Sequence, residues 1–201
     1  MEIREIIQYK NGKVCVLLEG GLSFVLYKKE FARFSLAEGD FLSEEQWHVI
    51  RNEILVNRAK KRAMYLLQKM DRTRKQLYDK LRESQYPEDV IEEALDYVAS
   101  FRYIDDGRYA ANYIHYQQGR KSKKQLTMDL IQRGVSREDL EHALKTEHTV
   151  SSEELILNWF SKKHYDPATA QDAERRRMYQ FLLRKGFSSQ EILRLMHLED
   201  C

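Results

Sequence analysis

The chain has 201 residues, of which 33% are charged and 42% apolar, with only eight glycines and two prolines. This composition favours two or more charge-covered helical units and excludes collagen-like and disordered chains. The two cysteines, Cys15 and Cys201, form neither a disulfide framework nor a metal-binding spacing. No apolar run approaches the ~18 residues that span a bilayer. We therefore expect a cytoplasmic protein without a membrane segment.

The first thirty residues have the chemistry of strands. Apolar, β-branched and aromatic residues gather at 3–9, 14–18 and 24–27 and predict a small antiparallel β-meander. Asn11-Gly12 predicts a type I′ turn in the first hairpin, and Gly20-Gly21 predicts the same turn in the second. A sheet of this size needs a helix to cover it.

From Ser43, whose spacing to Gln46 is that of a capping box, the sequence is helical almost to the end. The main signal is an internal repeat of about 50 residues. Apolar residues of the first copy recur 49 positions later, and those of the second copy recur after a further 52. The matching sets are Leu77, Leu81, Ile91 and Leu95; Leu126, Leu130, Leu140 and Leu144; and Met178, Leu182, Ile192 and Met196.

Each copy contains a helix pair joined by a short turn. Gly134 and Gly186 suit the left-handed conformation that ends a helix, and Gln85 occupies the same place in the first copy. A third helix precedes each pair, at 54–69, 105–118 and 152–164. The predicted fold is mainly α, with three tandem three-helix repeats forming an elongated curved solenoid behind the β-meander. The predicted divisions are 1–42, 43–103, 104–148 and 149–201.

Basic residues recur where the second helix of each repeat begins. In a solenoid, equivalent positions line up on one side, so these residues predict a positive strip that suits the acidic groove of a protein filament or phosphate. The alternative is a solvated face that the neighbouring acidic helices offset. The residues are Arg72, Arg74 and Lys75; Arg120, Lys121, Lys123 and Lys124; and Arg175, Arg176 and Arg177.

Catalytic and metal-binding patterns are absent from the sequence. There is no glycine-rich phosphate loop, and the six histidines show no zinc spacing. The adjacent acids Asp105 and Asp106 are typical of a helix cap rather than of a carboxylate pair. We expect a binding protein without enzymatic activity, metal or cofactor.

One segment carries a family resemblance. Residues 101–110 read Phe-Arg-Tyr-Ile-Asp-Asp-Gly-Arg-Tyr-Ala, which resembles the signature of the RecX family of bacterial recombination regulators. Arg102 departs from the glycine that is common there, so a differently shaped junction is expected. We interpret the signature as structural, with Tyr103 and Ile104 in the core, Asp105 as a cap and Arg108 paired with an acid. Its remaining members here are Asp106 and Tyr109.

The resemblance implies a regulator that binds the RecA recombinase and its filament on single-stranded DNA and limits filament extension in recombination, DNA repair and the SOS response. It also implies no catalysis. We expect a monomer, because an elongated chain needs no further burial. Two alternatives stay open: a nucleic-acid-binding helical repeat protein that acts on recombination indirectly, and a purely structural adaptor. Weak direct DNA binding is compatible with the function as a RecA regulator. Helical spacing predicts core packing for the tyrosines that could stack on bases, namely Tyr65, Tyr78, Tyr109, Tyr113 and Tyr116.

Overall fold

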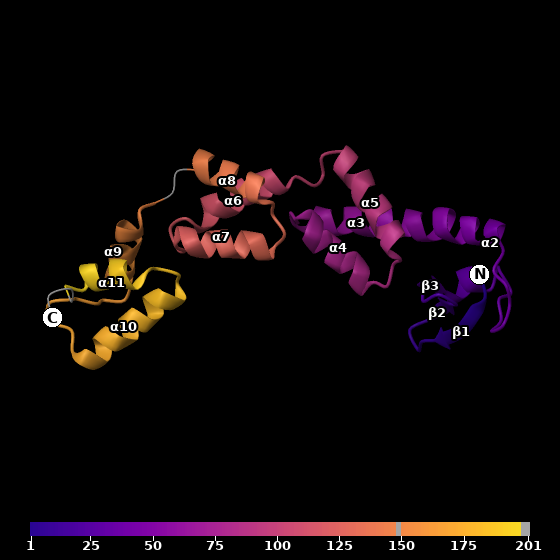
Figure 1. Cartoon of the computed structure of the whole chain (residues 1–201), viewed down its shortest axis with the longest axis horizontal. Coiled ribbons are helices and arrows are strands. Elements are labelled where there is room, and N and C mark those ends of the chain that lie inside the picture. The colour runs from indigo at the N-terminus through magenta and orange to yellow at the C-terminus, as the bar shows by residue number, and fades with distance from the viewer. Residues whose placement is uncertain (148–149, 198–201) are drawn as a thin grey trace. The chain divides into compact units, whose positions relative to one another are not determined.

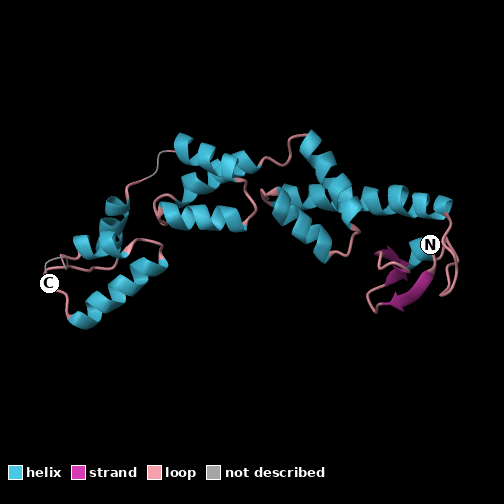
Figure 2. Ribbon diagram, in the orientation of Figure 1, coloured by secondary structure: helices cyan, strands magenta, loops and turns pink. Residues whose placement is uncertain are grey.

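A three-stranded antiparallel sheet begins the chain, as predicted (Figure 2). Strands β1 (Ile3–Gln8), β2 (Lys13–Leu18) and β3 (Ser23–Tyr27) pair in chain order, with Cys15 opposite both Ile7 and Val25. Helix α1 (Lys28–Phe31) follows directly. Strand β2 lies between the other two, so its ladder is paired on both edges.

The hairpin loops differ from the predicted type I′ turns. Gly12 has a φ of 77°, but Asn11 keeps a negative φ, and the Tyr9 amide donates to the Lys13 carbonyl at 2.8 Å across a three-residue loop. The glycines at 20–21 do have positive φ, as predicted, yet their loop also encloses a third residue. The longer loop lets glycine alone take the left-handed conformation after an ordinary turn. The two-residue prediction was therefore wrong.

A continuous helical run covers the sheet. Helix α2 (Glu44–His48), the wider helical segment η1 (Val49–Val56) and α3 (Asn57–Lys69) follow one another without a break. The Ser43 hydroxyl accepts from the Gln46 amide at 3.1 Å, which confirms the predicted capping box. Buried residues of η1 share one hydrophobic core with the inner face of the sheet and the first repeat.

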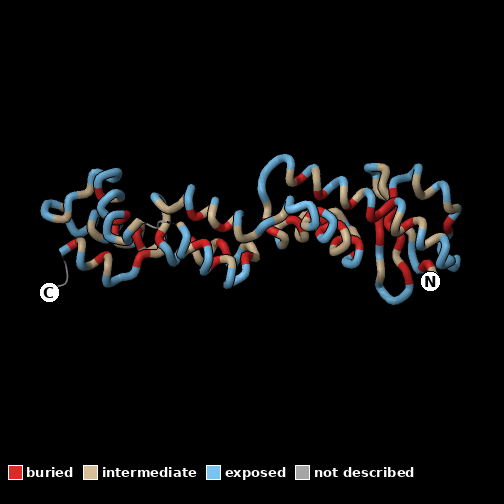
Figure 3. The backbone as a smooth tube through the Cα atoms, turned by 90° about the horizontal axis from the view of Figure 1, so that it is seen from above, coloured by how far each residue is buried: buried red, intermediate tan, exposed pale blue. Residues whose placement is uncertain are grey.

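Three three-helix repeats are present, as predicted (Figure 1). The first comprises α3, α4 (Arg74–Glu83) and α5 (Glu88–Ser100). The second comprises α6 (Asp106–Gln117), α7 (Lys123–Gln132) and α8 (Arg137–Thr146). The third comprises α9 (Ser152–Lys162), α10 (Asp172–Arg184) and α11 (Ser189–Leu195). Buried positions recur along each helix, so each repeat has an apolar interior (Figure 3).

The predicted left-handed helix ends are confirmed. Gln85, Gly134 and Gly186 have φ of 63°, 88° and 86°. Each is followed by a residue whose amide bonds back to the carbonyl five residues earlier, the bond that closes this type of helix end. Arg102 adopts the same geometry at φ 56°, so the expected change of shape at that junction was wrong. The hydrogen bond from the Tyr103 amide to the Val98 carbonyl, 3.0 Å long, holds the arginine in place.

Within the second unit, a close approach links the third repeat to the second. A Cβ atom at Gly186 would lie 2.6 Å from the Ser122 hydroxyl oxygen and 3.1 Å from the Gln125 Cβ. Ser122 is the buried N-cap of α7 and accepts from the Gln125 amide. The loop before α11 therefore packs against the start of α7, and only glycine leaves room for it.

The chain forms two compact units, Met1–Asp105 and Asp106–Cys201. The structure, a computed structural model, describes residues 1–147 and 150–197. The predicted division at 148/149 and Cys201 lie outside the described residues. The divisions at 42/43 and 103/104 and the curved solenoid stay predictions.

Candidate partner-binding surface

Two of the middle helices begin with cations where the helix dipole favours anions. Helices α5, α8 and α9 each have two acids in their first turn, whereas α4 and α7 have none. Lys123 and Lys124 instead occupy the first two positions of α7, and Arg74 and Lys75 those of α4. A cation there costs roughly 0.3–1 kcal/mol. Helix stability therefore does not account for these residues.

The third repeat breaks this pattern. Its middle helix starts at Asp172, with Gln171 as N-cap, so an acidic turn precedes the basic run. Asp166 closes a turn in the preceding connection by accepting from the Ala168 amide at 3.0 Å and the Thr169 hydroxyl at 2.9 Å. Arg176 consequently lies inside the helix rather than at its start.

Several predicted strip residues are engaged inside the protein. Arg74 pairs with Glu92 at 2.6 Å and with Asp96 at 2.8 Å, both on α5. Lys75 pairs with Asp79 one turn along α4 at 2.9 Å. The Arg74 ion pairs connect α4 to α5. The two carboxylates also offset the charge of Arg74, so it attracts an acidic partner less strongly.

Lys121 belongs to a polar network in the second repeat. Its ammonium donates to Asp129 and, at 2.9 Å, to the Tyr113 hydroxyl, which itself donates to Asp129 at 2.8 Å. Gln125 donates to the other carboxylate oxygen at 2.8 Å. Burial opposes the charged form of Asp129, but these three donors outweigh it and lower the pKa of its carboxyl. Lys121 is therefore a structural residue.

Among the described residues, ion pairs of the basic set are confined to Arg74, Lys75 and Lys121. Arg72 and Arg175 are half-buried, and the Nε atom of each is buried without a hydrogen-bond partner in the described part of the chain. The remaining members are exposed, and we call them the unpaired basic residues. They are Arg120, Lys123, Lys124, Arg176 and Arg177, all in the second unit.

The signature residues divide between surface and interior. Tyr103 was predicted to be core but is 49% exposed, because its ring stacks on Phe101 at 5.8 Å after the left-handed turn. Ile104 is partly buried and packs against the first core. Tyr109 is half-buried, and its hydroxyl accepts from Arg133 at 2.8 Å. Tyr103 therefore lies at the surface of the first unit.

The acidic end of the signature lies at the start of α6. Asp105 immediately precedes α6 and Asp106 is its first residue. Arg108 is exposed in the first turn of that helix. The capping role of Asp105 and the pairing of Arg108 with an acid stay predictions.

Sequence reasoning missed one basic and aromatic surface. Helix α3 contains five basic residues and no acid, and Tyr65 on its outer face is 49% exposed, against the predicted core packing. Arg62 and Lys69 lie 5.5 and 5.4 Å from the centre of the Tyr65 ring. Tyr116 is also exposed, at 75%. The sequence feature that could have predicted this surface is the set of five basic residues in α3 without an acidic residue among them.

The described part of the chain contains no cluster of histidine, cysteine or acidic side chains that could hold a metal ion. None of its helices has the length and apolar character that a membrane crossing requires. Cys15 is buried in β2, and burial raises the pKa of its thiol.

The architecture defines the class: a helical repeat protein with a small N-terminal sheet. Three family models describing the first, second and third three-helix domains of RecX match residues 59–97, 105–144 and 151–196. The chain therefore belongs to the RecX family of regulatory proteins.

Relatives and solved structures agree with this assignment. The regulatory protein RecX of Caldanaerobacter subterraneus is 26% identical over 97% of this chain and 98% of its own length. That of Clostridioides difficile is 23% identical over 97% of this chain and 94% of its own. A crystal structure of regulatory protein RecX, 25% identical, covers 98% of this chain and 99% of its own with a TM-score of 0.59. RecX from Lactobacillus salivarius has the same fold, with a TM-score of 0.53 over 72% of this chain and 97% of its own.

Proposed function

We propose that this chain binds the RecA recombinase and its filament on single-stranded DNA and limits filament extension and activity. It would act as a cytoplasmic monomer in recombination, DNA repair and the SOS response, without catalysis. Membership of a family of regulatory proteins supports the proposal. So does the resemblance of residues 101–110 to the RecX signature.

The position of two lysines at the start of α7 supports our choice of the surface that contacts RecA. Lys123 and Lys124 are exposed at the start of α7, where they oppose the helix dipole and pair with no described carboxylate. Cations retained at a cost to stability are expected where an anionic partner compensates for them. We therefore centre the interface on Lys123 and Lys124 and extend it to Arg120, Arg176 and Arg177.

The direct test is binding of the labelled chain to preassembled RecA filaments. Lys123→Glu with Lys124→Glu should weaken binding at least tenfold at low salt, because attraction becomes repulsion, and the loss should shrink as salt screens the charges. Lys28→Glu with Lys29→Glu is the matched control, since these exposed lysines also begin a helix, α1. Equal binding of the two double variants would remove α7 from the interface.

Direct nucleic-acid binding is the second candidate, and the α3 surface favours it. Two cations flank the exposed Tyr65 ring, an arrangement that suits phosphates beside a stacked base. Tyr65→Ala should then weaken binding to bare single-stranded DNA several-fold and leave binding to RecA filaments unchanged. An unchanged DNA affinity, measured at two salt concentrations, would argue against this candidate.

A further inference from the structure

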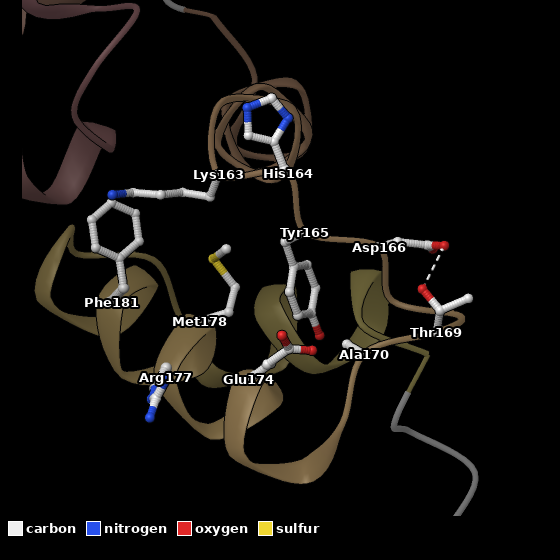
Figure 4. Close-up of a pocket in the computed structure, with 10 residues that line it drawn as sticks. All are labelled: Lys163, His164, Tyr165, Asp166, Thr169, Ala170, Glu174, Arg177, Met178 and Phe181. Atoms are coloured by element: carbon white, nitrogen blue, oxygen red, sulfur yellow. Dashed lines mark hydrogen bonds between the residues drawn. The ribbon is translucent and has the colours of Figure 1, made fainter.

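The third repeat contains a pocket of about 520 Å³ between the end of α9, the connection that follows it and α10 (Figure 4). Tyr165, Met178 and Phe181 supply its apolar wall, and the charged residues of the lining are Lys163, Arg177, Asp166 and Glu174. The volume is in the range of pockets that hold a ligand. All of these residues belong to one repeat, so the pocket is complete within it.

Local hydrogen bonds hold the pocket open. Helix α9 ends at Lys162, His164 follows with a φ of 51°, and the Tyr165 amide donates to the Phe160 carbonyl at 2.9 Å. The Tyr165 ring then packs on that of Phe160, with ring centres 4.8 Å apart. Asp166 turns away into its own connection, where the Ala168 amide and then the Thr169 hydroxyl lower the pKa of its carboxyl. The connection is therefore fixed without any occupant.

Cations gather on one side of the pocket. Figure 4 shows Lys163 extending to the ring of Phe181, with Arg177 on the same side and Asp166 on the opposite side. Beyond Phe181, the Trp159 ring makes an edge contact at 5.0 Å, and Lys185 lies over both rings at 5.0 and 5.5 Å. Residues 159–185 contain seven Lys or Arg against three Asp or Glu, a net charge of +4.

The details favour a protein segment over a nucleic acid. Tyr165, Met178 and Phe181 form an apolar wall that one apolar or aromatic side chain can fill, whereas phosphate groups gain nothing from such a wall. The Tyr165 hydroxyl is buried without a hydrogen-bond partner among the described residues, so an acceptor from an inserted segment would satisfy it.

We propose that this pocket is a docking site for an acidic segment of a partner protein that inserts one apolar or aromatic side chain. The anchor side chain enters between Tyr165, Met178 and Phe181, and flanking carboxylates meet Lys163 and Arg177. The site shares Arg177 with the interface proposed for RecA but goes beyond that interface, because an acidic segment of any partner with an aromatic anchor fits the pocket.

The test uses the full chain and a fluorescein-labelled peptide with one phenylalanine between acidic triplets, followed by anisotropy. A peptide with alanine at the anchor and an oligothymidylate are the competing probes. We expect the phenylalanine peptide to bind and the alanine peptide to bind at least tenfold more weakly. Lys163→Glu with Arg177→Glu, both exposed, should also cost at least tenfold, whereas Lys28→Glu with Lys29→Glu should cost nothing.

A local readout places the probe in the pocket. The chain has two tryptophans, so Trp47→Phe leaves Trp159 as the only one, and its emission should change on peptide binding. No binding at millimolar peptide, equal affinity of the two peptides, or unchanged affinity of the Lys163 and Arg177 variant would each overturn the proposal. Tighter binding of the oligothymidylate, lost in the same variant, would replace it with a polyanion site. The assay contains no RecA, so its failure leaves the proposed function standing.

Discussion

Gly186→Ala tests how the repeats of the second unit pack. The new Cβ would lie 2.6 Å from the Ser122 hydroxyl oxygen, which is too close without a shift. If the backbone moves to relieve this clash, the cost is about 1–3 kcal/mol. If the Ser122 hydroxyl rotates away from the Gln125 amide instead, the N-cap hydrogen bond of α7 is lost, which costs about 0.5–2 kcal/mol. The left-handed conformation at φ 86° adds about 1–2 kcal/mol for alanine. The variant should therefore lose about 1.5–5 kcal/mol of unfolding free energy, depending on which route relieves the clash.

A double-mutant cycle separates the two contributions. Ser122→Gly removes the obstructing oxygen, and glycine is itself an acceptable N-cap, so this change alone should cost a few tenths of a kcal/mol. In that background Gly186→Ala should cost less, namely the backbone part of about 1–2 kcal/mol and the smaller strain of the 3.1 Å approach to the Gln125 Cβ. Urea unfolding followed by circular dichroism measures all four proteins. Equal costs of Gly186→Ala in both backgrounds would refute contact between the third-repeat loop and α7.

Three further predictions concern caps and charges. Gln85→Gly relieves a non-glycine residue at φ 63° and should raise the free energy of unfolding by roughly 0.5–1 kcal/mol, seen as a higher urea midpoint; no gain would mean that the αL position carries little strain. Lys123→Gln with Lys124→Gln should stabilise the chain by about 0.6–2 kcal/mol while weakening filament binding, and a lower melting temperature would contradict the dipole argument. Because the folded-state pKa of Asp129 is lowered, its stabilisation is present above the unfolded pKa of about 3.9 and is lost as pH falls through the folded value. Asp129→Asn should therefore destabilise the chain at neutral pH and converge with the parent in acid; a pH-independent difference would count against this.

The sequence predicted the repeats and their helix ends because both depend on local chemistry. The serine that begins α8 caps its third residue, and Gly134 two positions earlier is left-handed, within one short segment that repeats along the chain. The hairpin loops were harder, because Asn11-Gly12 is compatible with loops of two or three residues. Which loop forms depends on the register of the flanking strands.

The functional surface was less predictable because it depends on contacts between helices. Nothing local to Arg74 reveals that Glu92 and Asp96 on α5 face it, or that Asp129 holds Lys121. Tyr103 was assigned to the core as part of the signature, but it follows the left-handed Arg102 and lies at the surface. Only the structure separates paired from unpaired cations.

The most direct test of the account is ATP hydrolysis by RecA on single-stranded DNA, titrated with this chain. We expect the rate to fall as the chain is added. The folded Lys123→Glu and Lys124→Glu double variant should need at least tenfold more protein for the same inhibition, while Lys28→Glu with Lys29→Glu should match the parent. A hydrolysis rate that stays unchanged at saturating amounts of the parent chain would contradict the proposal that it restrains RecA.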